Sequence, residues 1–113
     1  LRLLLFKKNE LSYSFINVIE LNTYCTKNKI NHIDILKIDA EGSELDILIG
    51  LKKRITKVRC VLFEHHYDKS LKKNYTFSDI NNFLNKNGFL QKGKFKMPFR
   101  KTFEYIYLNE RYK

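Results

Sequence analysis

Acidic and imidazole side chains directly follow two apolar segments of this sequence, and residues of these types could support chemistry. The first apolar segment, 33–38, is followed by Asp39 and Glu41; the second, 58–63, is followed by Glu64, His65 and His66. A carboxylate in such a place can act as a general base on a hydroxyl, orient a cationic ligand or bind a divalent cation. An imidazole titrates near neutral pH and is an alternative base.

Each of these side chains also has a structural explanation that involves no chemistry. Asp39 can accept hydrogen bonds from backbone N–H groups at a turn, and Glu41 can favour the positive end of the following helix. One histidine can pack in the core while the other is solvated. Glu44 and Asp46 lie in the first turn of a predicted helix, so we interpret both as ordinary helix-start acids.

The elements that must position these side chains alternate between strand and helix. Strands are predicted at 15–19, 33–38, 58–63, 89–96 and 102–108, and helices at 21–29, 44–55 and about 76–87. This order predicts an α/β fold with a mostly parallel sheet and helices on both faces. The last two strands are joined by a short turn and must pair antiparallel.

The ends of the two central strands are the expected location of a site. Ligands of open parallel sheets bind outside the carboxyl ends of the strands. If segments 33–38 and 58–63 are neighbouring strands, the polar residues that follow them border one crevice. The sequence therefore predicts that Asp39, Glu41, Glu64 and His65 line a common site.

The size of the chain limits what it can contain. Its 113 residues are enough for one domain with a modest core. The chain is small for an α/β enzyme, begins with Leu1, and has four glycines that form no phosphate-binding cluster. We therefore expect a portion of a larger domain.

A strong positive charge is the main feature of the composition. The chain holds 22 basic and 12 acidic residues, a net charge of +10, which could serve an anionic partner. The basic residues are spread along the chain without an aromatic-flanked Arg cluster, and Asn is also abundant, so we interpret most of them as solvated surface and expect no nucleic-acid partner. A non-catalytic basic binding module is the alternative, and it predicts salt-dependent binding to nucleic acid.

The cysteines and the N-terminal segment indicate in which cellular compartment the chain is expected. Cys25 and Cys60 have no spacing typical of a zinc site or a disulfide framework, so we expect free thiols in a reducing compartment and assign no metal ligand; participation of a divalent metal at the carboxylates is left open. The apolar segment 1–6 is too short for a signal core or a membrane span. These features predict a cytoplasmic chain without a membrane span.

The central segment resembles a family signature. The stretch ILKIDAEGSELDILIGLKK is similar to that of the FkbM-type methyltransferases, in which a strand is followed by K-I-D-V-E-G and then E-L-x-x-L-x-G. The matching positions are Lys37, Ile38, Asp39, Glu41, Gly42, Glu44, Leu45, Leu48 and Gly50. VLFEHHYD, YTFSDINNFLNKNGF and FEYIYLNE resemble later elements of the family, so the resemblance covers residues 16–110.

The resemblance implies a Rossmann-like class I methyltransferase that uses S-adenosylmethionine to methylate a hydroxyl of a sugar, glycan or other small molecule. Residues 1–113 would then be a single partial domain, the C-terminal half with strands four to seven, lacking the half that holds most of the cofactor. Asp39 and Ala40 would lie beside the cofactor, and Asp39 would orient or deprotonate the acceptor. Glu41 and Glu64 would shape the pocket, with His65 as an alternative base. A further alternative is that such a chain is a truncated remnant of a methyltransferase and has no activity.

Overall fold

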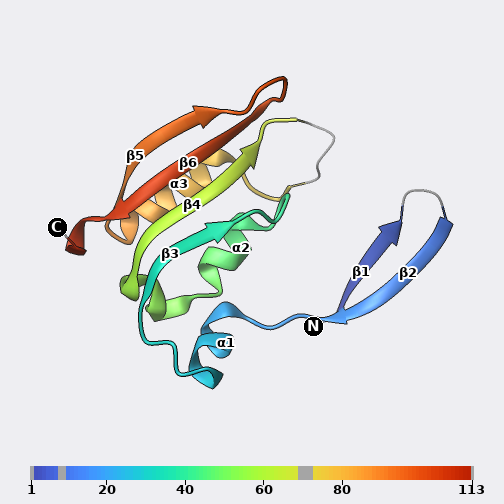
Figure 1. Cartoon of the computed structure of the whole chain (residues 1–113), viewed down its shortest axis with the longest axis horizontal. Helices are drawn as coiled ribbons and strands as arrows, with labels where there is room; N and C mark the ends of the chain where they lie inside the picture. Colours follow the sequence, from blue (N-terminus) through green and yellow to red (C-terminus); the bar gives the residue numbers. More distant parts are fainter. Residues whose placement is uncertain (1, 8–9, 69–72, 113) are drawn as a thin grey trace.

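The computed structural model describes residues 2–7, 10–68 and 73–112, which form six strands, three α-helices and two 3₁₀ helices (Figure 1). In chain order these are β1 (Arg2–Lys7), β2 (Glu10–Asn17), α1 (Leu21–Lys27), β3 (Ile33–Ile38), α2 (Glu44–Ile49), η1 (Lys52–Lys57), β4 (Val58–His66), α3 (Phe77–Lys86), β5 (Phe89–Lys96), β6 (Thr102–Asn109) and η2 (Glu110–Tyr112).

The main sheet has four strands in the order β3-β4-β6-β5. Strands β3 and β4 are parallel neighbours, with Ile38 opposite Phe63, whereas β6 pairs antiparallel with both β4 and β5. The predicted α/β class and the closing antiparallel hairpin are confirmed. The predicted mostly parallel sheet is wrong for this chain, because only one of the three strand pairs in the main sheet is parallel.

The N-terminal strand lies outside the main sheet. Residues 15–17 of the predicted strand 15–19 belong to β2, which pairs antiparallel with β1 in a separate two-stranded sheet, and residues 18 and 19 lie in no strand (Figure 1). A strand that pairs with its sequence neighbour closes a much shorter loop than one that crosses to a distant strand, and the entropy cost is lower. The predicted parallel pairing was therefore displaced by a local hairpin.

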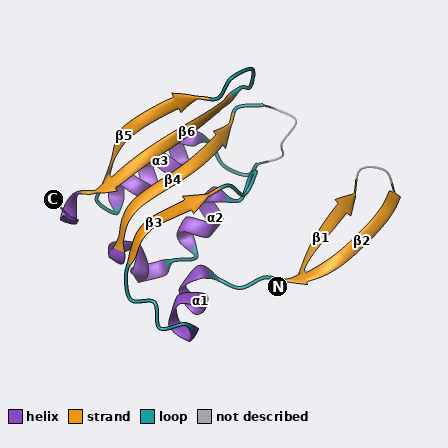
Figure 2. Cartoon of the chain, in the orientation of Figure 1, coloured by secondary structure: helices purple, strands orange, loops and turns teal. Residues whose placement is uncertain are grey.

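Helices α2 and α3 cover one face of the main sheet (Figure 2). Successive residues of a strand point to opposite faces, so Val61, Phe63 and His65 of β4 lie on the covered face and are buried. Tyr105 and Tyr107 of β6 lie beside them, and their rings stack on that of Phe63. This layer, with apolar residues of α2, η1 and α3, forms the core.

The opposite face of the sheet carries exposed apolar side chains. Ile35 is 65% exposed, and Leu90 and Leu108 are also exposed. Helices on both faces were predicted, but no helix among the described residues covers this face. That part of the prediction is wrong, because the elements that follow β3 and β4 both pack on the same side.

The helices that follow the central strands have clear boundaries. The predicted helix 44–55 breaks after α2, and the chain continues as η1, whose first residue Lys52 has φ 53°. Helix α3 begins at Phe77, and the preceding N-cap residue, Thr76, forms a reciprocal capping box with Asp79. The helix is followed by Gly88 with φ 85°, a conformation that favours glycine.

Candidate functional site

A tight turn after β3 holds the first group of predicted site residues. Asp39 and Glu41 are exposed and Ala40 is half-buried. Glu41 has φ 48° and Gly42 has φ 115°, so two successive residues with positive φ turn the chain from β3 into α2. A non-glycine residue in this conformation is strained, and such strain persists only where surrounding contacts hold it.

Glu44 supplies those contacts. Its side chain is 1% exposed, and both carboxylate oxygens accept from the Gly42 N–H, at 3.1 and 3.2 Å. The Tyr75 hydroxyl donates to the same carboxylate and also accepts from the Glu44 backbone N–H at 3.3 Å. Interpreting Glu44 as an ordinary helix-start acid was therefore incomplete, because this buried carboxylate connects the β3–α2 turn to a residue 31 positions later.

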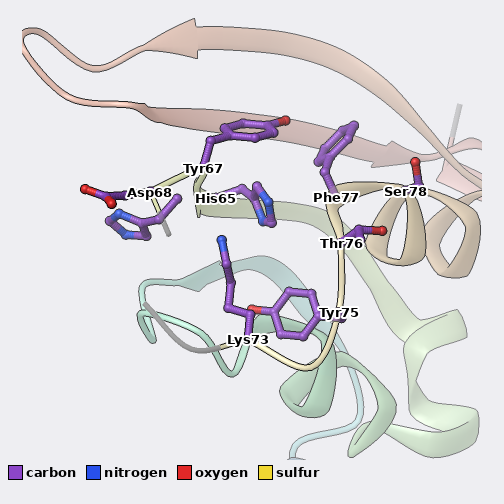
Figure 3. A pocket seen from close by; sticks show the side chains of 9 residues that line it. His65, Tyr67, Asp68, Lys73, Tyr75, Thr76, Phe77 and Ser78 are labelled. Atoms are coloured by element: carbon purple, nitrogen blue, oxygen red, sulfur yellow. The ribbon is translucent and has the colours of Figure 1, made fainter. Parts of the chain in front are cut away.

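Tyr75 lines an open pocket of about 470 Å³ at the carboxyl end of β4 (Figure 3). The walls are formed by the end of β4 and the two residues after it, by Lys73, and by the start of α3: His65, His66, Tyr67, Asp68, Lys73, Tyr75, Thr76, Phe77 and Ser78. The ring of His65 lies edge-on to Tyr67, with ring centroids 4.7 Å apart, and 5.8 Å from that of Phe77. Aromatic rings thus form much of the wall.

Among the predicted catalytic and cofactor-binding residues, His65 is the one that lines this pocket. Its side chain is 3% exposed, and its Nδ1 has no hydrogen-bond partner among the described residues. Burial, with smaller contributions from the positive charges of Lys73 and His66, lowers the pKa of His65 to about 4. The imidazole is therefore neutral at pH 7, and an unprotonated ring nitrogen can accept a hydrogen bond from a hydroxyl.

Glu64 lies on the other face of the sheet. The sequence predicted that the strand ends at residue 63, but β4 continues to His66, so Glu64 and His65 alternate in direction. Glu64 lies opposite Glu104 of β6, and its Oε2 is 3.9 Å from Nε2 of His66. The structure therefore does not bring Glu64 into the pocket that His65 lines.

A contact that the sequence did not predict connects the turn after β3 with the pocket that His65 lines. Asp39, Ala40 and Glu41 lie on the turn that Glu44 and Tyr75 tie to the His65 pocket. The pocket residues Tyr67, Tyr75 and Phe77 were also not predicted. Their signal was a concentration of aromatic residues in the segment between β4 and α3 and at the first residue of α3.

The residues present fit one end of S-adenosylmethionine, the cofactor of the family that the sequence resembles. Its sulfonium group is a cation, and the carboxylates of Asp39 and Glu41 are exposed at the carboxyl end of β3 beside the small residue Ala40. For the adenosine end, the described residues contain no glycine-rich turn after a strand. No group of three or more His, Cys, Asp or Glu side chains suitable for a metal ion occurs in the described ranges.

An α/β domain whose polar residues gather at the carboxyl ends of parallel strands is typical of enzymes that bind a small ligand at that edge. The family model described as the methyltransferase FkbM domain matches residues 3–90, most of the chain. The chain belongs to this methyltransferase family, which confirms the resemblance seen in its sequence. Searches of curated proteins and of solved structures give no significant match. None of the described helices has the length and apolarity needed to span a membrane.

Proposed function

We propose that this chain is the acceptor-side part of an S-adenosylmethionine-dependent O-methyltransferase that methylates a hydroxyl of a sugar or another small molecule. The observation that carries the proposal is the Gly42–Glu44–Tyr75 connection, which joins the carboxylate-bearing turn after β3 to the pocket after β4. A methyl transfer site needs a cation-binding edge and an acceptor pocket next to each other, because proximity and orientation supply much of the rate.

Asp39 has the central role in this proposal. When bound, S-adenosylmethionine supplies a methyl group whose carbon is electrophilic. Asp39 orients the acceptor hydroxyl and takes up its proton on a carboxylate oxygen, because an alkoxide is a far better nucleophile than an alcohol. Glu41 adds negative charge at the same edge and favours the cationic ligand there.

His65 positions the acceptor within the pocket after β4. It is neutral at pH 7 because burial lowers its pKa to about 4, so it can accept a hydrogen bond from a second hydroxyl of the acceptor. Its low basicity favours this positioning role over proton removal, and Asp39 is the better candidate for the base. Tyr67 and Phe77 contact the apolar face of the acceptor ring and exclude water.

The cofactor's adenosine end has no counterpart among the described residues, and we infer that residues beyond this part of the chain hold it. The cofactor contacts assigned to this chain are therefore limited to Asp39 and Ala40, next to the sulfonium group. Because this chain holds the acceptor pocket but few of the cofactor contacts, variants of the pocket should change the KM for the acceptor more than the affinity for the cofactor.

The proposal is tested on the protein produced with whatever residues its reading frame encodes before Leu1, by transfer of a radiolabelled methyl group from S-adenosylmethionine to a panel of sugars and cyclic alcohols. Asp39→Asn should lower kcat about 10²- to 10⁴-fold, the usual contribution of a general base, while leaving the fold intact. Asp46→Asn is the matched control, because Asp46 is an exposed carboxylate on the adjacent helix α2. Equal activity of Asp39→Asn and the unmodified protein would overturn the assignment.

A further inference from the structure

The first strand of the β5–β6 hairpin and its turn carry basic residues and no acidic one. Residues 89–103 contain five basic residues and no acidic one, whereas all 12 acidic residues lie elsewhere. Residues 47–63 also hold five basic residues and no acid, so charge alone does not distinguish the hairpin, and the exposed ring among its cations is the further observation. The basic residues of the hairpin segment are Lys92, Lys94, Lys96, Arg100 and Lys101.

The basic residues near the turn are available to a partner. Lys92 pairs with Glu110 at 3.2 Å, and Lys94 lies over the ring of Phe103, 4.5 Å from its centroid. Lys96, Arg100 and Lys101 are exposed, and they take part in none of the ion pairs found among the described residues. Exposed positive charge therefore lies on both sides of the turn.

An apolar tip lies between these cations. The connection between the two strands is Met97-Pro98-Phe99-Arg100-Lys101, and Phe99 is fully exposed. In Figure 1 this turn projects from the end of the sheet, away from the chain's C-terminus. The molecule thus presents one aromatic ring at a convex point surrounded by positive charge.

Phe99 is not explained by the stability of the fold. Its ring contributes no burial, and its backbone has φ 59°, a conformation that is costly for a bulky residue. Glycine at this position would relieve the strain at no loss of packing. A bulky residue with a strained backbone and a ring that packs against nothing in the fold points to an external contact.

We propose that the tip of the β5–β6 hairpin docks on an anionic membrane surface. Phe99 inserts at the boundary between headgroups and acyl chains, and Lys96, Arg100 and Lys101 bind the lipid phosphates. Charge complementarity supports this partner, because the free cations flank the ring on both sides. The inference is independent of the proposed methyl transfer, which takes place at the pocket after β4.

A single-stranded nucleic acid is a less suitable partner for this surface. Binding of that kind uses a positively charged groove with several aromatic platforms along it, on which successive bases stack. The tip of this hairpin is convex and offers one ring next to Met97 and Pro98, a shape suited to insertion. Nucleic-acid binding is therefore an outcome that the test must separate from lipid binding.

The experiment measures co-sedimentation of the full chain with vesicles of phosphatidylcholine alone and of phosphatidylcholine mixed with phosphatidylserine. Binding is expected only to the anionic vesicles and should weaken as salt is added. Each basic residue near an anionic surface changes the binding constant about five-fold, so Arg100→Gln/Lys101→Gln should bind about 25-fold more weakly. Phe99→Gly should bind about ten-fold more weakly while its melting temperature stays equal or rises.

The matched control is Lys53→Gln/Lys57→Gln, which makes the same change of charge on exposed residues of η1. It should retain most of the binding, because η1 lies at the other end of the sheet (Figure 1). Three results would overturn the proposal: an equal loss in the control, unchanged binding by Phe99→Gly, or equal binding to neutral vesicles. Binding to poly(U) RNA that the tip variants abolish, without vesicle binding, would assign the surface to nucleic acid instead.

Discussion

The link between Glu44 and Tyr75 gives a prediction that can be worked out from the structure. Glu44→Gln removes the charge of a carboxylate that is 1% exposed, and Tyr75→Phe removes the hydroxyl that donates to it. A buried hydrogen bond to a charged group contributes about 1.5–3 kcal/mol, so each single variant should lose about 2 kcal/mol of unfolding free energy. Both substitutions preserve the size of the side chain, so a cavity does not contribute.

The double variant separates a true link from two independent effects. Once either partner is gone, loss of the other matters little, so the double variant should lose only about 2.5 kcal/mol, which is a coupling of about 1.5 kcal/mol. Urea unfolding followed by circular dichroism measures all three values. Tyr24→Phe, a change at an exposed tyrosine of α1, is the control and should leave the unfolding free energy within about 0.5 kcal/mol. Additive losses, with coupling below about 0.5 kcal/mol, would refute the link.

Three other predictions concern stability. Burial lowers the pKa of His65 from 6.5 to about 4, so the contribution of His65 to the unfolding free energy is complete above pH 6.5 and is lost as the pH falls toward 4. In His65→Gln, the decline in unfolding free energy between those two pH values should be smaller by about 3 kcal/mol. Thr76→Ala removes the side-chain cap of α3 and should lower the unfolding free energy by about 1 kcal/mol in urea unfolding. Ser78→Ala, two residues later in the first turn of α3, is the control. Gly88→Ala should lower the unfolding free energy by about 1–2 kcal/mol, because alanine is strained at a φ of 85°. The nearest side-chain atoms leave room for a methyl group, so the loss reports the backbone alone, and a loss below about 0.3 kcal/mol would contradict this prediction.

Much of the fold was predictable because its signals are local. Strands β3 and β4, the capped helix α3 and the two strands of the closing hairpin are each marked by patterns within about ten residues. The end of β4 was not predictable, since Glu64, His65 and His66 are polar and are typical of a loop. They continue the strand because β6 pairs with them, and β6 begins 36 residues after β4 ends.

The site was predictable only in part for a similar reason. Sequence position placed Asp39 and His65 at the ends of neighbouring strands, and the structure agrees. The contact between Glu44 and Tyr75 depends on how the segment after β4 folds back over the β3–α2 turn, and no local pattern encodes it. The opposite directions of Glu64 and His65 follow from where the strand ends, a boundary that the sequence placed three residues too early.

The most direct test of the central claim is calorimetric titration of S-adenosylmethionine into the protein, produced with whatever residues its reading frame encodes before Leu1. The account predicts saturable binding, weakened about ten-fold by Asp39→Asn, because a carboxylate no longer faces the sulfonium cation, and unchanged by Asp46→Asn. No binding, or binding that Asp39→Asn leaves unchanged, would contradict a methyl transfer site at the carboxyl ends of β3 and β4.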